Sequence, residues 1–288
     1  MDCEHTNRPG RELASSRSVA PPKLTFGSRS ASSGLRHVNL GVLSPARELI
    51  ATAIPTMGPV RDHAFSPQER QAVYRAISQR RDMRRFVPGS AVSEEVLARL
   101  LQAAHAAPSV GLMQPWRFIR ITDDALRRHI HALVEQERLR TAEALGQRAQ
   151  EFLALKVEGI LECAELLVVA LCDGREAYVF GRRTMPQMDL ASVSCAIQNL
   201  WLSARSEGLG MGWVSLFDPE RLAALLSMPD DAEPVAILCL GPVPDFPDRP
   251  ALELDGWAFG RPIAEFVSEN GWGVPLITST GGSGKLGR

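Results

Sequence analysis

Four arginines gather around one carboxylate in segment 80–86, which reads Arg-Arg-Asp-Met-Arg-Arg-Phe. Arginines this close repel one another unless an anion lies among them, and a guanidinium group binds phosphate through two parallel hydrogen bonds. The segment therefore indicates a phosphate-bearing ligand. Asp82 would repel such an anion, so its presence indicates chemistry and not binding alone. A solvated run of charge at the end of a helix is the alternative interpretation, and this segment alone leaves it open.

The composition is that of an ordinary globular protein. The 288 residues carry a formal net charge of -1, and 45% of them are hydrophobic, which is enough for a sizeable core. A near-neutral chain lacks the basic face of a nucleic-acid-binding protein. The longest apolar run, 166–172, has the length of a strand and not of a membrane span. We therefore expect a cytoplasmic enzyme with neither a nucleic-acid nor a membrane partner.

The cysteines and histidines predict no metal site. The five cysteines are scattered and form no Cys-x-x-Cys pair, so they indicate buried thiols in a reducing compartment. Among the six histidines, His129 and His131 are two positions apart on an expected helix and therefore face different ways.

The composition also divides the chain into three parts. Residues 1–60 are rich in Ser, Arg, Pro and Gly, which predicts a disordered or mis-annotated N-terminal extension, with Met57 as an alternative initiator. Residues 61–272 are expected to form one folded domain of ordinary size. The Gly- and Ser-rich residues 273–288 are expected to form a flexible C-terminal tail.

Helices and strands interleave through the folded part. Ser66, Pro67 and Glu69 predict a capping box at the start of the first helix, so segment 80–86 falls at the end of that helix. The other expected helices are 93–106, 123–158 with a possible break at Gly146, 189–207 and 218–228, and the expected strands are 116–121, 166–171, 211–216 and 235–240. Because this order has no strict strand–helix–strand rhythm, we expect an α+β domain in which helices cover a mixed sheet around a central hydrophobic helix.

Four segments carry the functional signal in a fixed order. They are 80–86, the loop 108–116 (Pro-Ser-Val-Gly-Leu-Met-Gln-Pro-Trp), 181–189 (Gly-Arg-Arg-Thr-Met-Pro-Gln-Met-Asp) and 210–215 (Gly-Met-Gly-Trp-Val-Ser). Together they resemble the nitroreductase superfamily of FMN proteins, over essentially all of the folded part. Within that superfamily they are most similar to the branch that consumes reduced FMN to make 5,6-dimethylbenzimidazole, the lower ligand of vitamin B12.

The departures from ordinary nitroreductases point to the same branch. Asp82 stands where those enzymes usually have a serine, and Leu112 stands where they usually have an asparagine. The resemblance implies an oxygen-dependent fragmentation of reduced FMN to 5,6-dimethylbenzimidazole and erythrose 4-phosphate. It further implies that FMN is a substrate together with molecular oxygen, that a separate NAD(P)H-flavin reductase supplies it in reduced form, and that the enzyme is a homodimer.

The resemblance also implies roles for individual residues. Asp82 and Ser215 are the expected catalytic residues, because a carboxylate near an anionic reduced flavin has a raised pKa and exchanges protons, while the serine hydroxyl positions the flavin. In the superfamily, the loop 108–116 reaches the flavin across a dimer interface, and segment 174–188 is expected to form a lid against water. The expected FMN-binding residues are Arg80, Arg81, Asp82, Met83, Arg84, Pro108, Ser109, Leu112, Met113, Gln114, Gly212, Trp213, Ser215 and Arg261.

Plainer readings stay open beside these roles. Arg261 is equally well explained as a surface charge, Ser215 as a serine that satisfies backbone groups at a strand end, and Met113 as a core residue. Two other functions remain as well: an NAD(P)H-dependent FMN nitroreductase or dehalogenase that keeps its flavin, and a non-catalytic flavin-binding protein. Asp82 and Leu112 count against the first, and the Asp82 carboxylate counts against the second.

Overall fold

The computed structural model describes residues 63–275. The predicted N-terminal extension 1–60 and most of the predicted tail 273–288 lie outside the described residues. The helices are α1 (Pro67–Gln79), α2 (Glu94–His105), α3 (Asp124–Leu145), α4 (Ala149–Ala154), α5 (Met188–Ser206), α6 (Pro219–Leu225) and α7 (Ala251–Leu254), and the strands are β1 (Trp116–Ile121), β2 (Glu165–Leu171), β3 (Gly210–Val214) and β4 (Glu233–Gly241).

The four strands form one sheet in the order β1-β2-β4-β3, and each neighbouring pair is antiparallel. Strand β2 lies inside the sheet and every one of its residues is buried, as its continuous apolar sequence predicts. An isolated parallel bridge joins Asp82 to Met211 at the β3 edge. The expected α+β class is confirmed, and the parallel part of the expected mixed sheet is this single bridge among the described residues.

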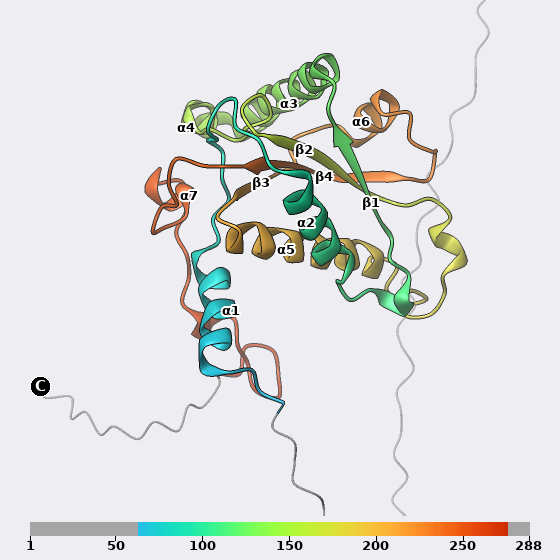
Figure 1. Ribbon diagram of the computed structural model, residues 1–288, viewed down its shortest axis with the longest axis vertical. Coiled ribbons are helices and arrows are strands. Elements are labelled where there is room, and N and C mark those ends of the chain that lie inside the picture. Colours follow the sequence, from blue (N-terminus) through green and yellow to red (C-terminus); the bar gives the residue numbers. More distant parts are fainter. Residues whose placement is uncertain (1–62, 276–288) are drawn as a thin grey trace, which may run out of the picture. The chain divides into compact units, whose positions relative to one another are not determined.

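Helices cover both faces of the sheet (Figure 1). Helices α2 and α5 pack on one face, where they share a hydrophobic cluster with alternate residues of the strands. Helices α3 and α6 pack on the other face around a second cluster. Helix α5 is the central hydrophobic helix that the sequence predicts, because Val193, Ile197 and Leu200 are fully buried on it.

The ends of the helices follow local signals. The predicted capping box is present, since the Ser66 hydroxyl accepts a hydrogen bond from the Glu69 N–H and the Glu69 carboxylate accepts one from the Ser66 N–H. Gly146, at a φ of 56°, separates α3 from α4 as anticipated. The expected continuation of the helix to residue 158 is wrong: α4 ends at Ala154, and Leu155 is extended with a ψ of 141°.

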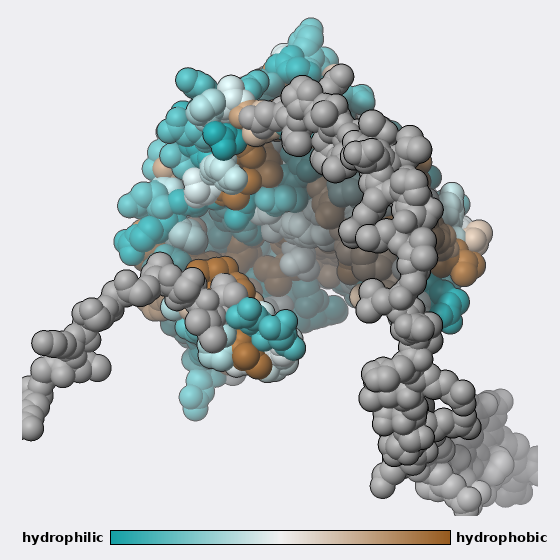
Figure 2. Space-filling view, turned by 90° about the horizontal axis from the view of Figure 1, so that it is seen from below, coloured by the Kyte–Doolittle hydropathy of each residue, from teal (hydrophilic) through white to brown (hydrophobic). Residues whose placement is uncertain are grey.

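Helix α1 leaves its apolar side uncovered in the single chain. It buries none of its residues, and Val73, Tyr74 and Ile77 are 48%, 69% and 49% exposed. The helix extends away from the sheet (Figure 1), and hydrophobic surface is visible on the face seen from that end (Figure 2). Within residues 63–275 no helix combines the length and the hydropathy needed to cross a membrane.

Candidate active site

A cavity of about 390 Å³ lies where the end of α1, the end of β3, the segment after α4 and the residues of α7 meet. Its size is within the range of small-molecule sites in proteins. The predicted site residues that line it are Arg80, Arg81, Asp82, Arg84, Trp213 and Ser215. The parallel bridge between Asp82 and Met211 brings the arginine segment against β3, so residues more than a hundred positions apart in the chain share one wall.

Asp82 is held from two sides at this wall. Arg84 donates from Nη1 to Asp82 Oδ1 over 2.7 Å and from Nη2 to Oδ2, and the Trp213 N–H donates to Oδ1 over 3.0 Å. The Asp82 side chain is 43% exposed, and Asp82 is one of the residues that line the cavity. Desolvation by the surrounding protein raises the pKa of Asp82, and the positive charge of Arg84 opposes that rise without cancelling it.

Arg80 and Arg81 are anchored by α5 and by the segment that precedes α7. The Arg80 guanidinium lies 4.4 Å from the centre of the Trp201 ring, and the Trp201 indole N–H donates to the Arg81 carbonyl over 3.2 Å. Arg81 donates to the carbonyl of Asp248, while its Nε is buried without a hydrogen-bond partner among the described residues. A buried unpaired donor is costly, so Arg81 has capacity for an acceptor that the protein does not supply.

Gly212 lets the arginine segment approach β3 closely. A Cβ atom on Gly212 would lie 2.1 Å from the Met83 carbonyl oxygen and 2.6 Å from Arg84 Nη1. Neither distance is tolerable, so glycine is required here if Arg84 is to reach Asp82. Met83 itself is only 7% exposed and belongs to the hydrophobic core beside the cavity.

The loop that carries the other predicted flavin contacts does not reach this cavity in the same chain. Pro108, Ser109, Leu112, Met113 and Gln114 are absent from its walls. Met113 is buried, and the Ser109 hydroxyl accepts a hydrogen bond from the Gln114 N–H over 3.0 Å. Leu112 and Gln114 have positive φ angles of 54° and 49°, a strained conformation for these residues and one that is common at functional sites.

Arg261 also lies apart from the cavity. Its Nε donates to Glu265 Oε2 over 2.7 Å, and its guanidinium lies 5.2 Å from the centre of the Phe266 ring on an exposed part of the C-terminal segment. The expected FMN contact of Arg261 stays a prediction, because Arg261 does not line the cavity of its own chain.

The cavity includes residues that the sequence interpretation missed. Lys156, the single lysine between residues 63 and 275, lines the wall after α4 and pairs with Glu162 over 2.6 Å. Trp257 lines the α7 side, and Arg148 lies 3.6 Å from the centre of its ring. A lone lysine in an apolar stretch was the available signal for Lys156, while nothing in the sequence marks Trp257.

The expected lid segment, 174–188, is held by a buried ion-pair cluster. Asp189 Oδ2 accepts from Arg175 Nε over 3.1 Å and from Arg182 Nη2 over 3.0 Å, and the Asp189 and Arg182 side chains are 8% and 5% exposed. The tip of the segment packs against the strained loop, because a Cβ atom on Gly111 would lie 3.2 Å from the Phe180 ring. Phe180 is nevertheless 84% exposed.

These features fit a flavin mononucleotide. The cavity wall offers several guanidinium groups and one ammonium group, which suit a phosphate and an anionic reduced ring. Arg81 Nε is a buried donor that lacks an acceptor among residues 63–275, and the Trp213 and Trp257 side chains supply aromatic and apolar surface. The donor set and the cavity size therefore agree with the ligand that the sequence resemblance implies.

The chain belongs to the nitroreductase family, whose model matches residues 77–242. It is 39% identical over 204 residues to the 5,6-dimethylbenzimidazole synthase of Rhodospirillum rubrum, which covers 69% of this chain and 94% of the relative. It is 38% identical over 201 residues to the enzyme of the same name from Rhodobacter capsulatus, with 69% and 96% covered.

The fold is also similar to a crystal structure of oxidised iodotyrosine deiodinase bound to FMN and 3-iodo-L-tyrosine. The two are 25% identical with a TM-score of 0.50, and the match covers 61% of this chain and 91% of that chain. At least one protein of this fold therefore binds FMN.

Proposed function

We propose that this chain is a 5,6-dimethylbenzimidazole synthase, which binds reduced FMN at the cavity around Asp82 and uses molecular oxygen to break it into 5,6-dimethylbenzimidazole and erythrose 4-phosphate. The observation that carries the proposal is the Asp82 carboxylate, which has a raised pKa and is held by Arg84 at the wall of an arginine-lined cavity. A site that only bound an anionic flavin would not benefit from a carboxylate there. The similarity to two synthases over nearly their whole lengths supports the same reaction.

Bound reduced FMN supplies the electrons for the reaction with oxygen. Asp82 is the proton-exchanging group, because its raised pKa brings it closer to neutral pH and its position at the cavity wall gives it access to the ligand. Arg84 and the Trp213 N–H fix the carboxylate oxygens, so that protons move at a defined place. Ser215 lies two residues beyond Trp213 at the same cavity, and its hydroxyl positions the ligand.

The working enzyme is a homodimer in this proposal. The loop with Ser109 and Gln114 is absent from the cavity of its own chain, so these residues can contact the flavin only from a second copy. The uncovered apolar side of α1 provides surface for such an association, since Val73, Tyr74 and Ile77 have no cover in the single chain. A separate NAD(P)H-flavin reductase then delivers reduced FMN, with residues 61–272 forming the catalytic domain.

A single-turnover experiment tests the proposal. The full chain is mixed anaerobically with one equivalent of chemically reduced FMN, oxygen is admitted, and the small molecules are separated and identified by mass. We expect 5,6-dimethylbenzimidazole with a matching loss of flavin. Intact oxidised FMN with hydrogen peroxide would overturn the proposal.

A flavin-retaining reductase or dehalogenase is the second candidate, and the similarity to iodotyrosine deiodinase favours it. It predicts that NAD(P)H and a nitro- or halo-aromatic compound are turned over repeatedly while FMN is conserved. The same preparation distinguishes the two, because one function consumes FMN and the other does not.

A further inference from the structure

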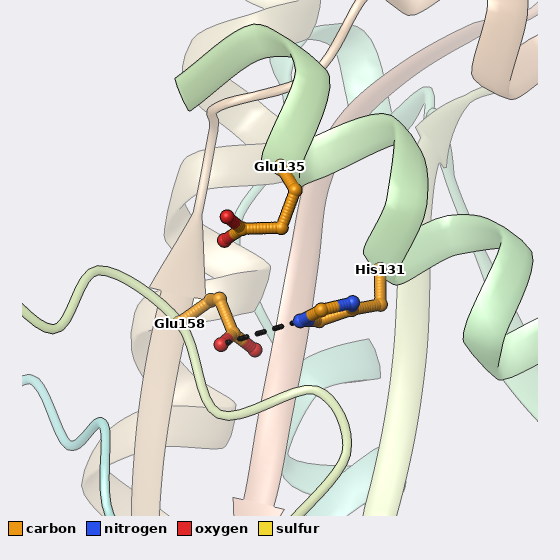
Figure 3. Close-up of side chains that lie close together, drawn as sticks. All are labelled: His131, Glu135 and Glu158. Carbon is orange, nitrogen blue, oxygen red and sulfur yellow. Dashed lines mark ion pairs between the residues drawn. The ribbon is translucent and has the colours of Figure 1, made fainter. Parts of the chain in front are cut away.

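Three side chains with metal-binding atoms meet between α3 and the segment that follows α4. His131 and Glu135 lie on α3, and Glu158 lies in the segment between α4 and β2. One ligand atom from each lies within 4.8 Å of the other two, and His131 Nε2 is 3.7 Å from Glu158 Oε1. Figure 3 shows the imidazole and the Glu158 carboxylate facing each other, with the Glu135 carboxylate one helical turn further on.

The spacing on α3 explains why the sequence interpretation missed this cluster. His131 and His129 face different ways, and on that ground the sequence predicts no metal site. The residue on the same face as His131 is Glu135, four positions later. The third residue, Glu158, joins them only because the chain leaves helical geometry after Ala154 and returns along α3.

Both carboxylates are already oriented by other protein groups. Glu135 Oε2 accepts a hydrogen bond from Arg138 Nη1 over 3.1 Å, and Glu158 Oε2 accepts one from the Ile160 N–H over 2.6 Å. Within residues 63–275, the second oxygen of each carboxylate accepts no hydrogen bond. Supporting donors that hold one oxygen and leave the other available are the usual outer shell of a metal site.

The charges around the cluster favour a dication. Two carboxylates repel each other at this distance, and Arg138 compensates for one negative charge. Lys156 lines the same cavity, but its charge is paired with Glu162. Glu135, Arg138 and Glu158 also line a cavity of about 220 Å³, so an ion and its water can enter. Imidazole with carboxylates suits a divalent transition metal such as Zn²⁺, whereas Mg²⁺ and Ca²⁺ favour sites made of oxygen alone.

We propose that His131, Glu135 and Glu158 form a binding site for a divalent transition metal of the zinc type, with water in the remaining position. Zinc holds such ligands at about 2.0–2.2 Å, so the three atoms must close by roughly 1 Å, which side-chain rotation can supply. The bound ion would tie α3 to the segment that ends at Glu158. Leu155, Lys156 and Val157 of that segment line the flavin cavity, so the ion would stiffen one of its walls.

Zinc binding to the full chain, prepared without a histidine tag and treated with a chelator, tests this site. Competition with a chromophoric zinc chelator should give one more zinc bound per chain in the wild type than in His131→Ala. Glu135→Gln and Glu158→Gln should each weaken binding at least tenfold. His129→Ala, two positions away on the outer side of α3, should bind as the wild type does. All variants keep the same cysteines, so zinc bound by thiols is common to them.

Thermal unfolding provides a second readout that does not depend on flavin. A ligand that binds the folded state alone raises the unfolding temperature as its concentration rises. Zn²⁺ should therefore raise the Tm of the wild type and of His129→Ala but not that of His131→Ala, and Mg²⁺ at the same concentration should have no effect. Equal zinc affinity and equal Tm shifts in wild type and His131→Ala would overturn the proposal and mark the bound zinc as adventitious.

Discussion

Arg84 binds both carboxylate oxygens of Asp82, its neighbour two positions earlier in the chain, and also donates to the Trp213 carbonyl over 2.9 Å. One guanidinium group therefore joins the arginine segment to β3 and fixes the proposed proton-exchanging group. A bidentate arginine is specific in direction as well as in charge. This geometry adds a positioning role to the FMN contact that the resemblance implies for Arg84.

Removal of Arg84 should raise the pKa of Asp82 further. The positive charge of Arg84 holds that pKa down against desolvation, so Arg84→Met leaves desolvation largely unopposed. The carboxyl carbon of Asp82, followed by NMR in protein labelled at aspartate, reports this pKa directly. Arg85→Met is the matched control, since Arg85 lies outside the cavity walls. An unchanged Asp82 titration in Arg84→Met would refute the coupling.

Asp82 should make the fold less stable as pH rises. Its pKa in the folded chain is above the ordinary value of 3.8, so the folded state holds the proton more tightly than the unfolded state does. The loss of stability from ionising Asp82 in the folded chain is absent below pH 3.8, grows as pH rises through the raised pKa, and is then constant. Asp82→Asn removes this dependence. As pH rises from 3.8 through the raised pKa, the unfolding free energy of Asp82→Asn, measured in urea, should therefore increase relative to that of the wild type.

A Gly212→Ala variant should lose the close contact between the arginine segment and β3. The added Cβ would fall 2.1 Å from the Met83 carbonyl oxygen, which is backbone and cannot turn aside. We expect a loss of roughly 2–3 kcal/mol in unfolding free energy and weaker binding of reduced FMN. Gly271→Ala, where the nearest atom is a Val274 methyl group at 3.2 Å, should change neither by much. Wild-type behaviour of Gly212→Ala would show that the segment can move away freely.

Asp189 should govern how well the lid segment protects the reaction. Asp189→Asn leaves the buried Arg182 and the partly buried Arg175 without their shared carboxylate, at a cost of about 3 kcal/mol. In the proposed dimer this segment lies beside the loop that serves the partner's cavity, so loosening it admits water. More hydrogen peroxide and less 5,6-dimethylbenzimidazole should then form per reduced FMN that is oxidised. Glu176→Gln removes the exposed partner of Arg182 and should leave the ratio of hydrogen peroxide to 5,6-dimethylbenzimidazole unchanged. An unaltered product ratio in Asp189→Asn would show that the Asp189 ion-pair cluster does not affect the reaction.

Local sequence signals predicted the parts of this protein that local physics determines. The capping box at Ser66, the glycine break at Gly146 and the apolar run of β2 all lie where they were expected. The family resemblance implies that the arginine segment and the end of β3 share a site, and the parallel bridge at Asp82 joins them.

Other features of the site depend on tertiary structure, which local sequence signals do not report. Lys156 lines the cavity because the chain becomes extended at Leu155, although helical propensity favoured continuation to residue 158. Trp257 follows α7, a one-turn helix too short to carry a periodic pattern. Leu112 has a φ of 54°, which the asparagine usual in nitroreductases would adopt more easily, and no pattern in one sequence reports such strain.

The fate of the flavin in wild type and in Asp82→Asn tests the central claim most directly. Each protein is loaded anaerobically with one equivalent of reduced FMN and exposed to oxygen, and flavin, 5,6-dimethylbenzimidazole and hydrogen peroxide are measured together. The wild type should lose flavin and form the benzimidazole, while Asp82→Asn should bind reduced FMN and return it as oxidised FMN with hydrogen peroxide. Benzimidazole formed by Asp82→Asn at the wild-type yield would contradict the role of this carboxylate.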